Sequence, residues 1–153
     1  MQTRREALQT TAAVATAIAT VGLLPQAAHA AFDKAAFSAK SVADAVKAMG
    51  GNGTMTESAD VKIVGPDIAE NGAVVPMAVS TTAAGAKKLL LLIEKNPSAL
   101  VASFNVTADV VPNFATRAKM GQSSDVYAVA IMADGKALFA KKEVKVTLGG
   151  CGG

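Results

Sequence analysis

Cysteine, histidine and aromatic residues are scarce in this sequence. Its 153 residues include one Cys, one His and no Trp, and aromatic residues make up only 4%. One cysteine cannot form an internal disulfide, and one cysteine with one histidine cannot build a multi-ligand zinc site. Charged residues, at 18%, are too dilute for a nucleic-acid-binding surface unless the basic ones cluster. The length predicts one domain, whose core must be filled by small and β-branched side chains.

The first thirty residues have the pattern of an export signal. The pair Arg4-Arg5 precedes a moderately apolar, Ala- and Thr-rich stretch from Ala7 to Leu24, and Ala28-His29-Ala30 supplies a small-residue cleavage site. We predict cleavage after Ala30 and export to the periplasm by the twin-arginine route, with ordinary Sec export as the alternative. An uncleaved anchor is disfavoured because the apolar run is short and Thr-rich for a span of ~20 residues.

Removal of this signal changes the composition that matters for function. The mature chain, Ala31–Gly153, contains no histidine, and the net charge falls by one. Histidine-based triads, histidine general bases and histidine metal ligands are therefore excluded. No other segment is long and apolar enough to span a membrane. We expect a soluble periplasmic protein.

The start of the mature chain, residues 31–53, predicts one helix followed by a loop. Apolar residues recur there at the spacing of a single helix face. These residues are Phe32, Ala35, Ala39, Val42, Val46 and Met49. Asp33 suits the N-terminal end of the helix dipole, and Gly50-Gly51 suits a helix end.

Residues 54–148 have the short apolar segments and closely spaced turn signals of an all-β domain. Asn71-Gly72 is a turn dipeptide and Asp134-Gly135 is a hairpin signal, and short apolar or alternating segments lie between the turns. The segments are Val61–Val64, Val74–Ser80, Leu89–Ile93, Leu100–Val106, Phe114–Met120, Val126–Met132, Lys136–Lys142 and Val144–Leu148. We predict an immunoglobulin-like antiparallel β-sandwich of about seven strands, with a small barrel as the alternative.

Two features of this domain allow two interpretations each. Leu89–Ile93 is too apolar for a strand with one wet face, so it is either buried on both sides, by the sandwich and the helix, or docked on a partner. The lysines of the last hairpin form either a solvated face or a mildly positive patch that attracts anions. They are Lys136, Lys141, Lys142 and Lys145.

The chain ends in a short segment that cannot pack. Gly149, Gly150, Gly152 and Gly153 surround the single cysteine, Cys151. Glycine has maximal backbone freedom and no side chain to bury, so residues 149–153 are predicted to form a flexible arm with a thiol near its tip. The interpretation we favour is a covalent carrier, whose thiol holds a substrate and delivers it to separate enzymes. The alternatives are a disulfide to another subunit and a tail with an incidental cysteine.

Three segments resemble one known family. V-K-V-T-L-G-G-C-G-G at 144–153 looks like the end of SoxY, the sulfur-carrier subunit of the bacterial thiosulfate-oxidising (Sox) system. P-D-I-A-E-N-G-A-V-V-P at 66–76 resembles that family's P-x-I-A-E-N-G-x-x-V-P stretch, and V-A-I-M-A-D-G at 129–135 is similar to its penultimate strand and turn. The resemblance spans the mature chain and includes the twin-arginine leader.

The resemblance implies a carrier rather than an enzyme. It implies an immunoglobulin-like fold and a heterodimer with SoxZ, a second small β-sandwich subunit that typically lacks its own export signal. Sulfur intermediates would be held on Cys151. A haem cytochrome enzyme would join thiosulfate oxidatively to this thiol, and a dimanganese thiosulfohydrolase would release sulfate from the S-thiosulfonate. The chain itself would need no cofactor.

Overall fold

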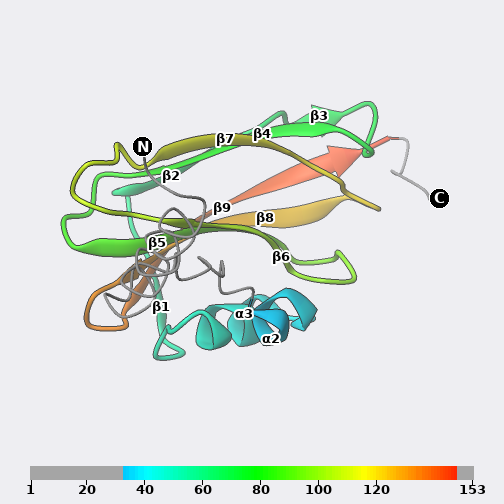
Figure 1. Cartoon of the computed structure of the whole chain (residues 1–153). Coiled ribbons are helices and arrows are strands. Elements are labelled where there is room, and N and C mark those ends of the chain that lie inside the picture. Colours follow the sequence, from blue (N-terminus) through cyan, green and yellow to red (C-terminus); the bar gives the residue numbers. More distant parts are fainter. Residues whose placement is uncertain (1–32, 148–153) are drawn as a thin grey trace, which may run out of the picture. The chain divides into compact units, whose positions relative to one another are not determined.

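Two β-sheets face each other in the computed structural model, which describes residues 33–147 (Figure 1). The helices are α2 (Lys34–Ser38) and α3 (Val42–Ala48). The strands are β1 (Met55–Glu57), β2 (Val61–Val64), β3 (Ile68–Ala69), β4 (Val75–Thr81), β5 (Ala86–Ile93), β6 (Leu100–Asn105), β7 (Asn113–Ala118), β8 (Ser124–Met132) and β9 (Ala137–Val146). The larger sheet has the order β1-β9-β8-β5-β6, with β3 also paired to β9, and the smaller has the order β2-β4-β7. The predicted all-β, immunoglobulin-like sandwich is confirmed.

Strand β5 lies at the centre of the fold and contributes to two cores. Leu89, Leu91 and Ile93 pack between the two sheets, whereas Leu90 and Leu92 pack against the helices on the other face of the larger sheet. All five side chains are fully buried. Burial of one such side chain contributes about 1.5–3 kcal/mol, which is why residues 89–93 of this strand are all apolar. The interpretation that this run is buried on both sides is confirmed, and the run is not a docking surface.

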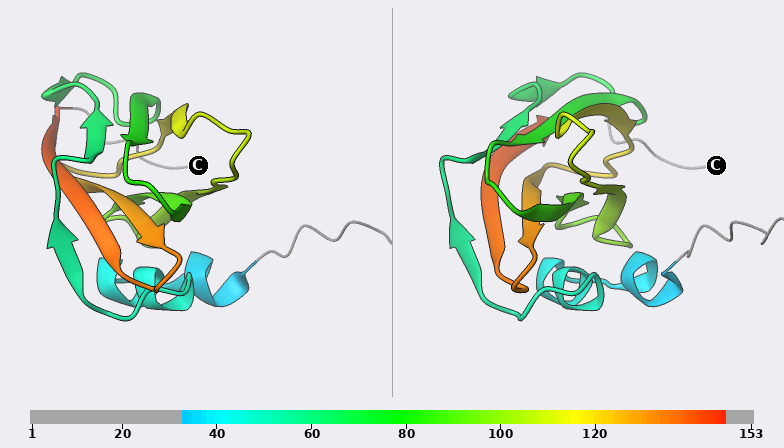
Figure 2. Two further views of the ribbon diagram at one scale, coloured as in Figure 1. Left: turned by 90° about the vertical axis from the view of Figure 1, so that its left-hand side faces the viewer. Right: turned by 60° about the vertical axis from the view of Figure 1, so that its left-hand side comes forward.

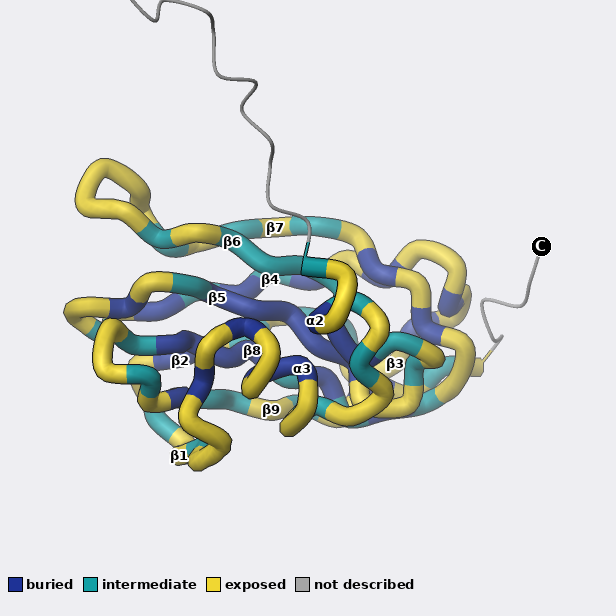
Figure 3. Tube along the Cα trace, turned by 60° about the horizontal axis from the view of Figure 1, so that its bottom comes forward, coloured by how far each residue is buried: buried dark blue, intermediate teal, exposed yellow. Residues whose placement is uncertain are grey.

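Helices α2 and α3 cover the second of these cores. Figure 2 shows them on the side of the larger sheet that faces away from the smaller sheet, and Figure 3 shows buried segments concentrated in β5 and β8. Ala36, Ala45, Val46 and Met49 supply the buried helical contacts. No helix within residues 33–147 is long and apolar enough to cross a membrane.

The prediction of one continuous helix was wrong, because the chain breaks between Ser38 and Val42. Ala39 is extended, and its carbonyl accepts a hydrogen bond from the N–H of Ala99 (2.9 Å). Ser41 then caps α3 by accepting from the N–H of Asp44 (3.1 Å). In a continued helix the N–H of Asp44 would donate to a backbone carbonyl of the preceding turn. Here it donates to the Ser41 side chain instead, which marks the start of a second helix. The break also changes the buried face of the first helix, from the predicted Ala35 to Ala36.

The structure differs from the predicted strands in three places. Residues 136–142 and 144–148 were expected to be two strands, but a single strand β9 covers 137–146. Strands β1 and β3 were not predicted, since each is short and largely exposed. Both pair with β9 in parallel, unlike the other ladders of the sandwich, which are antiparallel. The hairpin at Asp134-Gly135 is confirmed, with Gly135 at a φ of 83°.

Candidate functional site

The predicted site residues and the predicted signal lie outside the described residues. Cys151, the four glycines of residues 149–153, Leu148 and the signal 1–30 all fall in this category. The structure instead shows the strand that leads to Cys151, because β9 ends at Val146 and Thr147 is the last residue described. The contacts that hold the end of β9 are the described part of the chain nearest in sequence to the predicted site.

Strand β3 holds one edge of this end. It runs parallel to β9, with Ile68 opposite Lys145 and Ala69 opposite Val146. The N–H of Lys145 donates to the carbonyl of Asp67 (2.9 Å), and the N–H of Thr147 donates to the carbonyl of Ala69 (3.1 Å). These bonds hold the last two residues of β9 and the residue that follows it against β3.

Side-chain hydrogen bonds reinforce the same end. The hydroxyl of Ser123 accepts from the N–H of Val146 (2.9 Å). The hydroxyl of Thr147 donates to the carbonyl of Glu70 (3.2 Å). Val144, two residues before Val146, is fully buried between the sheets. Contacts from two separate segments, around residues 67–70 and at Ser123, thus fix where the C-terminal segment begins.

A salt bridge joins β9 to the residue that precedes β3. Lys142 Nζ lies 2.8 Å from the carboxylate of Asp67. The hydrogen bond from Lys142, and then its positive charge, lower the pKa of the exposed Asp67 carboxyl below its ordinary value. An exposed ion pair adds little to global stability, but this one adds a side-chain contact to the backbone pairing of β3 and β9.

The segment 66–76, singled out by its sequence, is the piece of chain that makes most of these contacts. Asn71 turns the chain after β3, since its side-chain carbonyl accepts from the N–H of Ala73 (2.8 Å). The carbonyl of the buried Gly72 accepts from the N–H of Met120 (2.7 Å). An Asx turn of this kind is the local chemistry that Asn-Gly pairs favour. The sequence marked this segment by resemblance, but gave no signal that it pairs with the last strand.

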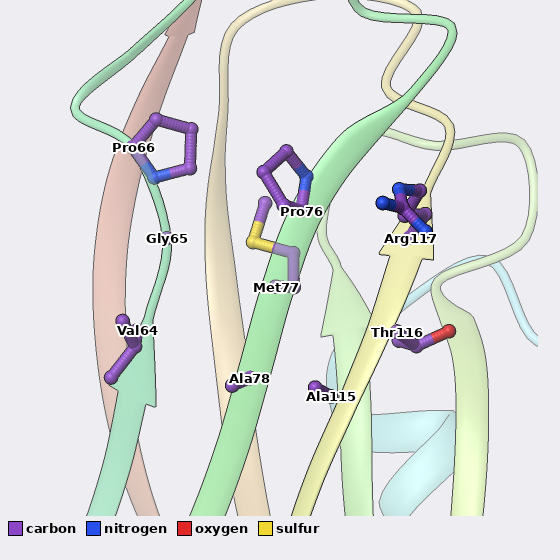
Figure 4. A pocket seen from close by; sticks show the side chains of 9 residues that line it. All are labelled: Val64, Gly65, Pro66, Pro76, Met77, Ala78, Ala115, Thr116 and Arg117. Atoms are coloured by element: carbon purple, nitrogen blue, oxygen red, sulfur yellow. The ribbon is translucent and has the colours of Figure 1, made fainter.

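Beside this segment lies an open groove of about 490 Å³. Residues 64–66, 76–78 and 115–117 line it (Figure 4). The ladder between β2 and β4 ends at the pair Val64 and Ala78. Pro66 and Pro76 follow on the two sides, and neither has an N–H to continue the ladder. The strands therefore separate there, and Met77, which is itself buried, lies beneath the gap.

The lysines of the last hairpin are mostly paired with carboxylates. The pairs are Lys136 with Asp134 (3.1 Å), Lys141 with Asp125 (3.3 Å) and Lys142 with Asp67 (2.8 Å). Only Lys145 has no such pair among the described residues. This arrangement favours the solvated face over an anion-attracting patch. Within residues 33–147, no three His, Cys, Asp or Glu side chains lie together as a metal site would require.

Comparisons with known proteins found one matching family and several similar solved structures. The profile of the family described as "Sulfur oxidation protein SoxY" matches residues 46–151. Among solved structures, the sulfur carrier protein SoxY from Chlorobium limicola f thiosulfatophilum is 36% identical, with a TM-score of 0.61 over 69% of this chain and 94% of that chain. A superoxide reductase (neelaredoxin) variant from Ignicoccus hospitalis shares the fold alone, at 20% identity and a TM-score of 0.50 over 56% of this chain and 78% of that chain.

A search of curated protein sequences gave no match. The SoxY profile, in contrast, covers more than half of the chain and extends from α3 to the cysteine that follows β9. The segment that fixes the end of β9 and the cysteine beyond it both lie within this match. The chain therefore belongs to the SoxY family of sulfur oxidation proteins.

Proposed function

We propose that this chain is a periplasmic sulfur carrier, which holds sulfur-oxidation intermediates covalently on Cys151 and presents them to partner enzymes. The observation that carries the proposal is the extent of the family match, which reaches residue 151. The firmly held end of β9 supports it, because a carrier segment needs a fixed point of attachment. The chain acts in this proposal as a carrier subunit without catalytic activity of its own.

Loading of the thiol is an oxidation that a partner must drive. Thiosulfate and the Cys151 thiol form a sulfur–sulfur bond, giving an S-thiosulfonate, one proton and two electrons. The electrons pass to the haem cytochrome partner. This chain contributes the sulfur atom that forms the bond, and thiolate is the form that reacts.

Release of sulfate is a hydrolysis. Water attacks the terminal sulfone sulfur of the S-thiosulfonate, the sulfur–sulfur bond breaks, and sulfate, a proton and a persulfide on Cys151 result. A dimanganese thiosulfohydrolase supplies the activated water, since a metal ion makes water a strong nucleophile at neutral pH. Further partners oxidise or remove the persulfide sulfur and so regenerate the thiol.

The proposal includes a heterodimer with a SoxZ-type subunit and export by the twin-arginine route. A leader on this chain alone would carry both subunits to the periplasm, if they assemble first. Substitution of both Arg4 and Arg5 by Lys tests the route by cell fractionation. We expect both subunits to remain in the cytoplasm, and periplasmic accumulation of the variant would overturn this part.

Thiosulfate-dependent respiration of cells that carry Cys151→Ser tests the carrier role. We expect respiration to be lost, while the thermal stability of the chain and its binding to SoxZ stay unchanged. Retained thiosulfate oxidation in this variant would exclude the carrier role. A stable disulfide dimer as the sole working form, seen on non-reducing gels, would instead favour a structural role for Cys151.

A further inference from the structure

The outer face of the smaller sheet changes its character along the strands. One row across the three strands consists of the paired polar residues Lys62, Ser80 and Asn113. Two residues further along, the next row consists of Val64, Ala78 and Ala115. A solvated outer face of an antiparallel sheet is normally polar throughout, so the second row needs an explanation.

The apolar half of this face continues beyond the sheet. Val64 is 66% exposed, and Ile68 and Val74, which flank Pro66 and Pro76 in the chain, are 58% and 54% exposed. Val64 lines the groove of about 490 Å³ together with Pro66 and Pro76, and Ile68 and Val74 each lie two residues from one of these prolines in the chain. Exposed apolar side chains around a groove, at one end of a sheet, are typical of a protein–protein contact. We call the surface made by Val64, Ile68, Val74 and the groove the apolar end.

The charge at the rim of this surface indicates what the occupant carries. Arg117 is exposed on β7, the edge strand of the smaller sheet, and its side chain borders the groove (Figure 4). Within residues 33–147, neither Arg117 nor Lys62 forms a salt bridge. An unpaired guanidinium beside an apolar groove matches a carboxylate on an opposing surface.

The position of this surface relates it to the carrier segment. Ile68 belongs to β3, whose pairing with Lys145 helps to fix the end of β9. A protein docked on the apolar end therefore lies beside the point from which the segment with Cys151 begins. The other conspicuous exposed valine, Val111 (81% exposed), is in the β6–β7 connection, next to the polar row.

We propose that the apolar end is the surface on which the SoxZ-type subunit docks, and that this subunit presents apolar side chains to the groove and a carboxylate to Arg117. The inference rests on the proposed function for the existence of that partner. It replaces the Leu89–Ile93 run, which the fold buries, as the docking surface.

The affinity of the chain for a SoxZ subunit that is expressed and purified separately tests the assignment. Val64→Asp places a charge in the apolar end, and we expect it to weaken SoxZ binding by about tenfold or more, as loss of a central apolar contact does. Val111→Asp is the matched control at another exposed valine, and binding is expected to stay within about twofold of wild type. Isothermal titration calorimetry on the full mature chain measures both.

Charge reversal tests the rim separately. Arg117→Glu is expected to lower the rate of association with SoxZ and to weaken the salt dependence of that rate. A charge at the rim of an interface acts mainly on the rate at which the two proteins associate. Lys40→Glu makes the same charge change at an exposed residue between α2 and α3, and it is expected to change neither. Circular dichroism melts confirm that all four variants fold.

The outcomes separate this inference from the carrier role. Wild-type affinity for SoxZ in both Val64→Asp and Arg117→Glu would overturn the docking surface, while loss of adducts in Cys151→Ser would leave the carrier role standing. If Val64→Asp abolishes self-association of the chain and leaves SoxZ binding intact, the occupant is a second copy, and the assignment is wrong. Failure of the wild-type chain to bind SoxZ would overturn both the inference and the proposed heterodimer.

Discussion

The backbone N–H of Thr147 donates a hydrogen bond to the carbonyl oxygen of Ala69, 3.1 Å away. The hydroxyl of the same residue donates to the carbonyl of Glu70, 77 residues earlier in the chain. These two bonds tie the residue that follows β9 to β3 and to the residue after it. The segment 66–76, which carries the family resemblance, therefore has a structural role, namely to hold the end of β9.

Removal of the Thr147 N–H tests this role. Thr147→Pro cannot donate to Ala69, whereas the control Thr147→Val keeps the N–H and loses only the hydroxyl. One net hydrogen bond contributes about 1 kcal/mol, so we expect amide exchange of Lys145 and Val146 to rise by about fivefold or more in Thr147→Pro. Native-state hydrogen exchange measures this. Equal protection in the two variants would mean that this backbone bond does not hold the end of β9.

The salt bridge between Asp67 and Lys142 predicts a pH dependence. Its hydrogen bond and charge lower the pKa of Asp67 in the folded chain, so its contribution to stability is complete above the ordinary aspartate pKa of about 3.9. The contribution is lost as the pH falls through the lowered pKa. Asp67→Asn should remove this part of the acid-side loss, a small effect because the pair is exposed. Melting temperatures from pH 6 down to about pH 3 provide the measurement. Identical profiles for the variant and the wild type would contradict the pairing.

The sequence was sufficient for features that local chemistry decides. The Leu89–Ile93 run indicated a strand without a solvent-exposed face, one of whose two interpretations was burial on both sides, and Asp134-Gly135 indicated a hairpin. The sequence was insufficient where contacts between residues far apart in the chain determine the local structure. The helix breaks at Ala39 because Ala99, on the connection to β6, takes its carbonyl. Strand β3 is two residues long with an exposed Ile68, and only its pairing with β9 makes it a strand.

The groove could not be predicted from the sequence for a related reason. Pro66 and Pro76 are each unremarkable in the sequence, and the gap between β2 and β4 arises only because the register brings them to the same end of the ladder. Cys151 was predicted as the site from composition and spacing alone, since it is the single cysteine in a run of glycines, and this stays a prediction because the residue lies outside the described range. The contacts that hold the end of β9 could not be predicted in that way, because they come from residues far apart in the chain.

Substitution of two neighbouring leucines tests the two-core arrangement. Leu90→Ala removes a side chain that packs against the helices, and Leu91→Ala removes one that packs between the sheets. Both leucines are fully buried, so each substitution should lower the free energy of unfolding by about 2–5 kcal/mol. Urea denaturation of the two variants measures this. A loss well under 1 kcal/mol for Leu90→Ala would show that the helices do not cover this face.

The close approach of Gly65 to Met77 predicts a small-residue requirement beside the groove. A Cβ at residue 65 would lie 2.7 Å from Met77 Sδ, so the buried methionine must move. We expect Gly65→Ala to lower the free energy of unfolding by about 1 kcal/mol, in the range of mild overpacking. Gly121→Ala is the matched control, since a Cβ there meets nothing within 4 Å. Equal stability of the two variants would contradict the tight packing of Gly65 on Met77.

Intact-mass analysis of the chain, after incubation with thiosulfate and the partner enzymes, tests the carrier role most directly. The account predicts a reductant-sensitive thiosulfonate adduct that maps to Cys151, its conversion to a persulfide when the hydrolase is added, and no adduct on Cys151→Ser. Thiosulfate turnover without any adduct on Cys151, or with unchanged turnover in Cys151→Ser, would contradict it.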